Sequence, residues 1–326
     1  MENSGSLRRF PLAGIAAAAA SVVCFRTGFG SFFFLLPLAL LAFSAEAKSA
    51  WAAGIMGTAF NTIVSLWFYM YRGADLDFAR WSALYYAIMA LAFTWINAPL
   101  GRFWIHLDAP YRMAFAALCC TLVMAPVFLT MTEDPRLRLA IVRQLQALGG
   151  FSESPGVEGP TADELFAAMI RMGLRGGILV SCLVFWWINR QLGLGIIRIS
   201  RRGNGKLPVS ILAFHAAPFL IWIFSLSLGA VLLGKTAGLE MLEIGGWNIL
   251  VLSGTLFLVQ GGAVALFYLL KVPPLIRIIV NLGIIILIFK PGVNAALLGM
   301  LLLLGIAENW VPFRVPRDEP PPTPEA

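Results

Sequence analysis

The sequence predicts an all-α fold, a polytopic transmembrane bundle of about eight to ten helical spans. Of its 326 residues, 59% are apolar and only 13% are charged. A soluble domain has roughly a quarter charged residues, so this chain has too little polar surface to face water on all sides. In lipid, backbone polar groups must be satisfied internally, which leaves helices and closed barrels. Barrel strands alternate apolar and polar residues, whereas Ile278–Phe289 and Asn294–Ile306 are nearly continuous apolar runs.

The ten apolar segments that we interpret as spans are Leu12–Phe25, Phe29–Ala45, Ala50–Tyr71, Trp81–Leu100, Met113–Met131, Phe166–Asn189, Val209–Gly234, Trp247–Leu270, Leu275–Phe289 and Gly292–Ala307. The middle six have the ~20 residues that a perpendicular crossing needs, and the first two and last two are shorter. Tight turns join each short pair, at Arg26-Thr27-Gly28 and at Lys290-Pro291-Gly292. Each short pair therefore forms either two thin crossings, which we favour, or a re-entrant hairpin.

The spans fall into two groups, 12–131 and 166–307. Residues 1–11 precede them, residues 132–165 connect them outside the cytoplasm, and residues 308–326 form a Pro-rich tail. Within the connection, the apolar residues between Leu137 and Leu148 share one helical face, which predicts an interfacial helix on the membrane surface. Thr161 and Glu164 form a capping signal at the start of the next helix.

The basic residues predict a cytoplasmic amino terminus, because Lys and Arg gather on the inner side of a membrane. In that orientation fourteen of the 24 basic residues are inside, whereas Arg26 and Lys290 are outside. The decisive segment is Arg190–Lys206, which has five bases and no acid. The carboxyl terminus is then cytoplasmic too. Arg8-Arg9 before the first apolar segment also fits a signal peptide, but the spans that follow favour an uncleaved first helix.

Gly229–Thr236 matches the phosphate-loop pattern GxxxxGK[ST]. A phosphate loop follows a strand and precedes a helix, so that its backbone N–H groups surround the phosphates. Here the pattern closes an apolar span, and we interpret Lys235 as a lysine that snorkels at a helix end. The four cysteines lie within apolar runs and the chain has two histidines, a distribution that predicts no metal site. We also expect no cofactor.

Neutral polar side chains inside the apolar segments are the candidates for solute binding. No Asp or Glu lies in mid-span, which argues against a proton-coupled transporter. Amides and aromatic rings between apolar walls suit a small neutral solute, and the same groups also join helices to each other. The candidate ligand-binding residues are Asn61, Asn97, Trp247, Asn248, Gln260 and Tyr268.

Small residues on the first segment predict a close contact with another helix. Ala13 with Ala17, and Ala16 with Ala20, form overlapping small-xxx-small pairs, and such a face lets a second helix approach closely. That helix belongs either to this chain or to a partner subunit. The net charge of +7 is scattered among segment ends. Basic residues at these positions set the orientation of the spans in the membrane, and without a single basic patch they predict no nucleic-acid binding.

Three stretches carry a resemblance to a known family; they are Arg201–Pro208, Gln260–Tyr268 and Leu304–Arg314. With the amphipathic insert before a span that ends in a basic stretch, they resemble the YybS-like family of bacterial polytopic membrane proteins. The last acidic position of the family is usually Asp, and here it is Glu308. The family is distantly similar to the S-components of energy-coupling-factor transporters. This resemblance implies capture of a small solute in the bacterial inner membrane, partner ATPases that supply energy, and docking through an Ala-rich first helix such as Ala13–Ala20.

These observations lead to a transport-related membrane protein that is not an enzyme, since no nucleophile–base pair or metal constellation is visible. The lipid bilayer is its surrounding, and other membrane subunits or energising ATPases are its expected partners. The alternative is a structural or regulatory membrane protein that binds no solute and assembles with other membrane proteins.

The orientation can be tested by labelling from outside intact cells. We expect a single cysteine at Ser200→Cys, in a chain whose four native cysteines are replaced, to resist a membrane-impermeant maleimide, because Arg190–Lys206 faces the cytoplasm. The same cysteine should react after the cells are permeabilised. Efficient labelling of intact cells would show that the chain has the opposite orientation.

Overall fold

The computed structural model describes residues 4–44, 47–72, 76–133, 135, 138–139, 161–200, 211–288, 290 and 292–314. This part of the chain is helical and has no strand, which confirms the all-α prediction. The chain divides into two compact units, Met1–Lys206 and Leu207–Ala326, and each is described by itself. The predicted interfacial helix and the Pro-rich tail after Arg314 lie outside the described residues, apart from Pro135, Arg138 and Leu139.

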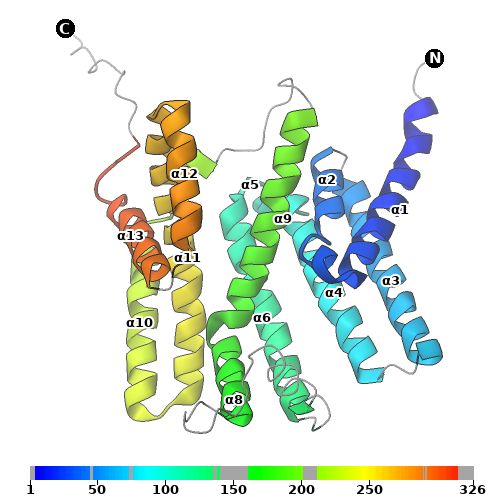
Figure 1. Cartoon of the computed structure of the whole chain (residues 1–326), viewed down its shortest axis with the longest axis horizontal. Helices are drawn as coiled ribbons and strands as arrows, with labels where there is room; N and C mark the ends of the chain where they lie inside the picture. Colours follow the sequence, from blue (N-terminus) through cyan, green and yellow to red (C-terminus); the bar gives the residue numbers. More distant parts are fainter. Residues whose placement is uncertain are drawn as a thin grey trace. The chain divides into compact units, whose positions relative to one another are not determined.

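The helices of the first unit are α1 (Ser4–Arg26), α2 (Leu36–Ser44), α3 (Ala47–Arg72), α4 (Leu76–Asn97), α5 (Arg102–His106), α6 (Ala109–Glu133), α8 (Ala162–Met172) and α9 (Ile178–Ser200). A 3₁₀ turn, Gly28–Phe32, joins α1 to α2, and a π-helical turn, Gly173–Gly177, joins α8 to α9. In Figure 1, α3 and α4 lie side by side as an antiparallel pair.

The second unit begins with a 3₁₀ turn and continues with four helices: Ile211–Ala213, α10 (Leu220–Ala237), α11 (Glu240–Lys271), α12 (Pro274–Ile288) and α13 (Val293–Ala307). α10 and α11 form a long antiparallel hairpin (Figure 1), and α13 packs against α11.

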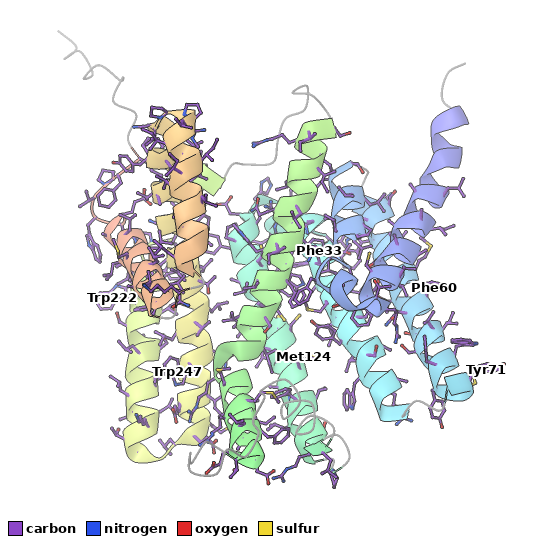
Figure 2. All side chains as sticks on the ribbon, in the orientation of Figure 1. Phe33, Phe60, Tyr71, Met124, Trp222 and Trp247 are labelled. Carbon is purple, nitrogen blue, oxygen red and sulfur yellow. The ribbon has the colours of Figure 1, made fainter. Side chains whose placement is uncertain are left out.

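Five helical stretches are long and apolar enough to cross a membrane: Ala47–Tyr71, Ala109–Thr130, Asp163–Ser200, Leu220–Ala237 and Glu240–Lys271. Shorter apolar helices accompany them, among them Leu12–Arg26 and Val293–Ala307. Large apolar side chains cover their outer faces; Phe60 and Tyr71, for example, project from α3 in Figure 2 and are 44% and 73% exposed. Such surfaces need a lipid solvent, so the five stretches fit a multi-pass membrane protein.

Three predicted segments differ from the helices that form. Val209–Gly234 is helical only from Leu220, because residues 214–217 have no regular structure. Phe29–Ala45 is divided between the 3₁₀ turn and the nine residues of α2. Trp81–Leu100 lies largely in α4, which is not among the five long apolar stretches.

The first short pair of segments forms two helices of unequal length. The nine residues of α2 rise about 14 Å, which is half of a ~30 Å hydrocarbon core. α2 packs against α1, α3, α4 and α9 of the same unit. α1 has 23 residues and rises about 33 Å, enough for a crossing, so the choice between two thin crossings and a re-entrant hairpin stays a prediction. We call the pair formed by α1 and α2 the N-terminal hairpin.

The predicted capping signal is confirmed at the start of α8. The Thr161 hydroxyl accepts a hydrogen bond from the Glu164 amide at 3.3 Å, and the Glu164 carboxylate accepts one from the Thr161 amide at 2.7 Å. The predicted span Phe166–Asn189 then bends at Gly176, whose φ of 109° only glycine adopts without strain. The bend breaks one long helix into α8 and α9.

Two glycines allow α11 and α13 to touch backbone to backbone. A Cβ at Gly261 would lie 1.9 Å from the Leu301 carbonyl oxygen, and a Cβ at Gly305 would lie 1.9 Å from the Phe257 carbonyl oxygen. Neither partner atom belongs to a flexible side chain, so the helices must separate to admit a methyl group. Close packing is the main source of helix association in lipid.

We therefore expect Gly261→Ala to destabilise the second unit by about 1–3 kcal/mol or more, the usual cost of overpacking. Gly262→Ala is the matched control, because a Cβ at Gly262 meets nothing within 4 Å. The measurement is the melting temperature of the purified full chain in detergent. Equal melting temperatures for the two variants would contradict the close contact.

Candidate functional site

Arg26, at the tip of the N-terminal hairpin, is hydrogen-bonded to polar groups on α3. Its Nε donates to the Asn61 side-chain oxygen at 3.1 Å, and its Nη2 donates to the Asn61 carbonyl at 3.4 Å and to the Ser65 hydroxyl. Asn61 and Ser65 are buried, at 0% and 2% exposure. The guanidinium carbon also lies 5.8 Å from the centre of the Phe68 ring.

The contacts of Arg26 place its charge far from both ends of α3. Asn61 is the fifteenth residue of this helix, so it lies about 21 Å from the first Cα and about 16 Å from the last. The charge count assigns Arg26 to the extracytoplasmic side, but a residue beside Asn61 is near the middle of the span. The sequence signal for this position is the Arg26-Thr27-Gly28 turn between two short segments.

Every partner of Arg26 in the described part of the chain is neutral or aromatic. The three hydrogen bonds use Nε and Nη2, so the two N–H groups of Nη1 donate to none of the described residues. A charged group in a membrane normally pairs with another charge or faces water. Arg26 thus keeps its charge and two donors available.

A tyrosine and a serine form a second polar contact among the helices that surround Arg26. The Ser21 hydroxyl donates to the Phe34 carbonyl at 2.6 Å and lies 2.7 Å from the Tyr86 hydroxyl. Gly57 faces Tyr86 so closely that a Cβ would come within 2.6 Å of the Tyr86 hydroxyl. The ring of Phe25 packs edge-on against Tyr86 at 5.2 Å. Helices α1, α3 and α4 therefore hold one polar cluster within an aromatic surround.

The second unit contains a buried ion pair. Arg314 and Glu308 form two hydrogen bonds, at 2.6 Å and 2.8 Å, and their side chains are only 5% and 1% exposed. Arg314 also donates to the carbonyl oxygens of Leu212 and Phe214. Leu212 lies in the 3₁₀ turn before α10, and Phe214 lies in the irregular segment that follows this turn. The backbone of the irregular segment is not helical.

Gln260 completes the attachment of this irregular segment. Its side-chain oxygen accepts a hydrogen bond from the Ala216 amide at 2.6 Å, and Gln260 is 1% exposed. Tyr268, which is 49% exposed, donates to the Phe313 carbonyl at 3.0 Å beside Arg314. Two predicted ligand-binding residues therefore hold backbone segments in place, through the Gln260 oxygen and the Tyr268 hydroxyl.

In the described structure, the other predicted residues form no bond to Arg26 and do not hold the irregular segment before α10. Asn97 is at the end of α4; its amide donates to the Phe93 carbonyl at 2.9 Å, and its buried oxygen has no partner in the described structure. Asn248 is buried on α11 and donates to the Ile244 carbonyl at 2.9 Å. Trp247 projects from the same helix (Figure 2) and is half-buried. The six predicted residues are thus divided between the two units, and only Asn61 contacts Arg26.

The alanine stripe of α1 lies mainly on its outer surface. Ala13, Ala16 and Ala20 are exposed and Ala17 is half-buried. The buried face consists of Gly14, Ala18, Ser21 and Val22, and packs toward α3. Within the described residues, three of the four alanines are therefore free to meet lipid or another chain.

The phosphate-loop pattern lies in a regular helix. Gly229–Thr236 is inside α10, and Gly234 packs against the backbone of Glu243 on α11, where a Cβ would come within 2.6 Å of an amide nitrogen. A helical backbone uses its N–H groups in its own hydrogen bonds, so this segment does not form a phosphate cradle. Across the described residues no three His, Cys, Asp or Glu side chains are grouped to hold a metal ion.

Comparison of the chain with protein-family models, with curated proteins and with solved structures finds no match.

The buried ion pair makes a stability prediction. Arg314→Gln leaves the Glu308 carboxylate buried without its partner and frees two backbone carbonyls, so we expect a loss of about 3–5 kcal/mol and a lower melting temperature. Tyr268→Phe is the control, because it removes one partly exposed hydrogen bond, worth about 1 kcal/mol. Similar melting temperatures for Arg314→Gln and the unaltered protein would contradict the structural role of the pair.

Proposed function

We propose that this chain is a multi-pass membrane protein that captures a small solute with an anionic group, and that Arg26 recognises that group. The observation that carries the proposal is a guanidinium near the middle of a span that has neutral partners and two N–H groups that donate to none of the described residues. Arginine binds carboxylates and phosphates through such paired donors. The free charge of Arg26 changes the expectation from a neutral solute to an anionic one.

The surroundings of Arg26 support binding at this position. Asn61 and Ser65 fix the orientation of the guanidinium, and preorganised donors hold an anion at a lower entropic cost than mobile ones. Nearby aromatic rings, including Phe25 and Phe68, exclude water and strengthen the attraction between opposite charges. The tip of the hairpin thus provides one charged donor within apolar walls, a usual composition for a ligand site.

The wider proposal follows from the resemblance to YybS-like proteins and S-components. In it, the chain is a solute-capturing subunit of the bacterial inner membrane with both termini in the cytoplasm, and partner ATPases energise it. The exposed residues Ala13, Ala16 and Ala20 offer a shallow face for such a partner. The same face supports the alternative, a structural or regulatory membrane protein that assembles with other membrane proteins and binds no solute.

The two functions differ in what remains bound to Arg26 after purification. We expect small anions released from the heat-denatured, full-length protein, identified by mass spectrometry, to be lost by Arg26→Gln, because neutral glutamine attracts anions weakly. Lys290→Gln is the matched control, since it removes one basic residue from the turn between α12 and α13. An identical set of anions in all three proteins, or none in any, would contradict anion capture and favour the structural alternative.

A further inference from the structure

A second pair of arginines lies in the first unit on two other helices. Arg112 is the fourth residue of α6 and Arg190 is in the middle of α9. Helices α6 and α9 pack against each other, and the positive charge of Arg112 acts on Arg190. Arg190 lies over the ring of Phe43, 5.8 Å from its centre, and Arg112 donates weakly to the Trp104 carbonyl at 3.4 Å.

Neither arginine has a carboxylate partner among the described residues. The Nε atoms of Arg112 and Arg190 are both buried and have no hydrogen-bond acceptor there. Asp108 acts on Arg112 only through its charge, without forming an ion pair, and its side chain is exposed. Two like charges and two unsatisfied donors therefore lie on two helices that pack together.

An oxyanion between the two side chains removes both unfavourable features. It neutralises the repulsion and accepts hydrogen bonds from the two Nε groups, and guanidinium groups match the tetrahedral oxygens of a phosphate well. Arg112 also lies in the first turn of a 25-residue helix, where the helix dipole favours a negative charge.

We propose that Arg112 and Arg190 together bind one phosphate group. The group is either the headgroup of an anionic phospholipid or a soluble phosphate, and both present the same oxygens. A lipid suits the nearby cluster of Trp95, Trp104 and Phe115, whose rings lie 4.8–6.0 Å apart, because tryptophan is enriched at headgroup depth. Both arginines are also on the predicted cytoplasmic side, where anionic lipids gather.

The test uses the full chain in detergent and follows its melting temperature with two probes. One is phosphatidylglycerol in mixed micelles, compared with diacylglycerol of the same acyl chains, and the other is inorganic phosphate, compared with chloride at equal ionic strength. We expect one probe to raise the melting temperature by about 2 °C or more, because a ligand of the folded state stabilises it. The probe that acts identifies the source of the phosphate.

Three variants show whether the two arginines cause this shift. Arg112→Gln and Arg190→Gln should each lose most of it, and neither should melt lower than the unaltered protein without probe, because each relieves repulsion. Arg198→Gln, an exposed basic residue on the same helix as Arg190, should keep the full shift. The proposal is wrong if neither probe stabilises the unaltered protein, or if Arg198→Gln loses as much of the shift as the other two.

Discussion

The constraint on which this structure depends is that lipid offers no hydrogen bonds, so the protein must satisfy every backbone group that leaves a helix. The irregular segment before α10 illustrates the solution. Arg314 binds the carbonyls of Leu212 and Phe214, and Gln260 binds the amide of Ala216. The Arg314 side chain donates the hydrogen bonds that a turn of helix would otherwise provide, and Glu308 balances its charge.

The same constraint distinguishes Arg314 from Arg26, two arginines that each form several hydrogen bonds. Arg314 has a carboxylate and backbone carbonyls as partners, so its charge and its donors are used within the protein. Arg26 has an asparagine, a serine and aromatic rings, which orient the guanidinium without neutralising it. Stability explains the surroundings of Arg314 fully. It explains the orientation of Arg26, but not the absence of a negative partner among the described residues.

Composition and apolar runs predicted the helical class because they depend on local chemistry alone. The capping box at Thr161 and Glu164 was predictable for the same reason. The positions of Arg26 and Arg314 were not predictable, because they depend on contacts between residues 35 and 102 positions apart, such as Arg26 with Asn61 and Arg314 with Leu212. Gln260 and Tyr268 were predicted to bind a ligand, and the structure shows them bonded to Ala216 and Phe313, where they hold the backbone.

Two stretches that the sequence singled out, 260–268 and 304–314, gain a physical explanation from the second unit, whereas 201–208 lies outside the described residues. Gln260 and Gly261 lie on α11, and Gly305, Glu308 and Arg314 lie on or just after α13. Gly261 and Gly305 bring these two helices into backbone contact, and α13 is followed by Glu308 and by Arg314, which bonds to the segment before α10. One set of residues thus sets both the spacing of the helices and the hydrogen bonds of an irregular segment. These motifs therefore serve the architecture of the second unit, whereas Arg26, Arg112 and Arg190, which form no ion pair with a described residue, lie in the first.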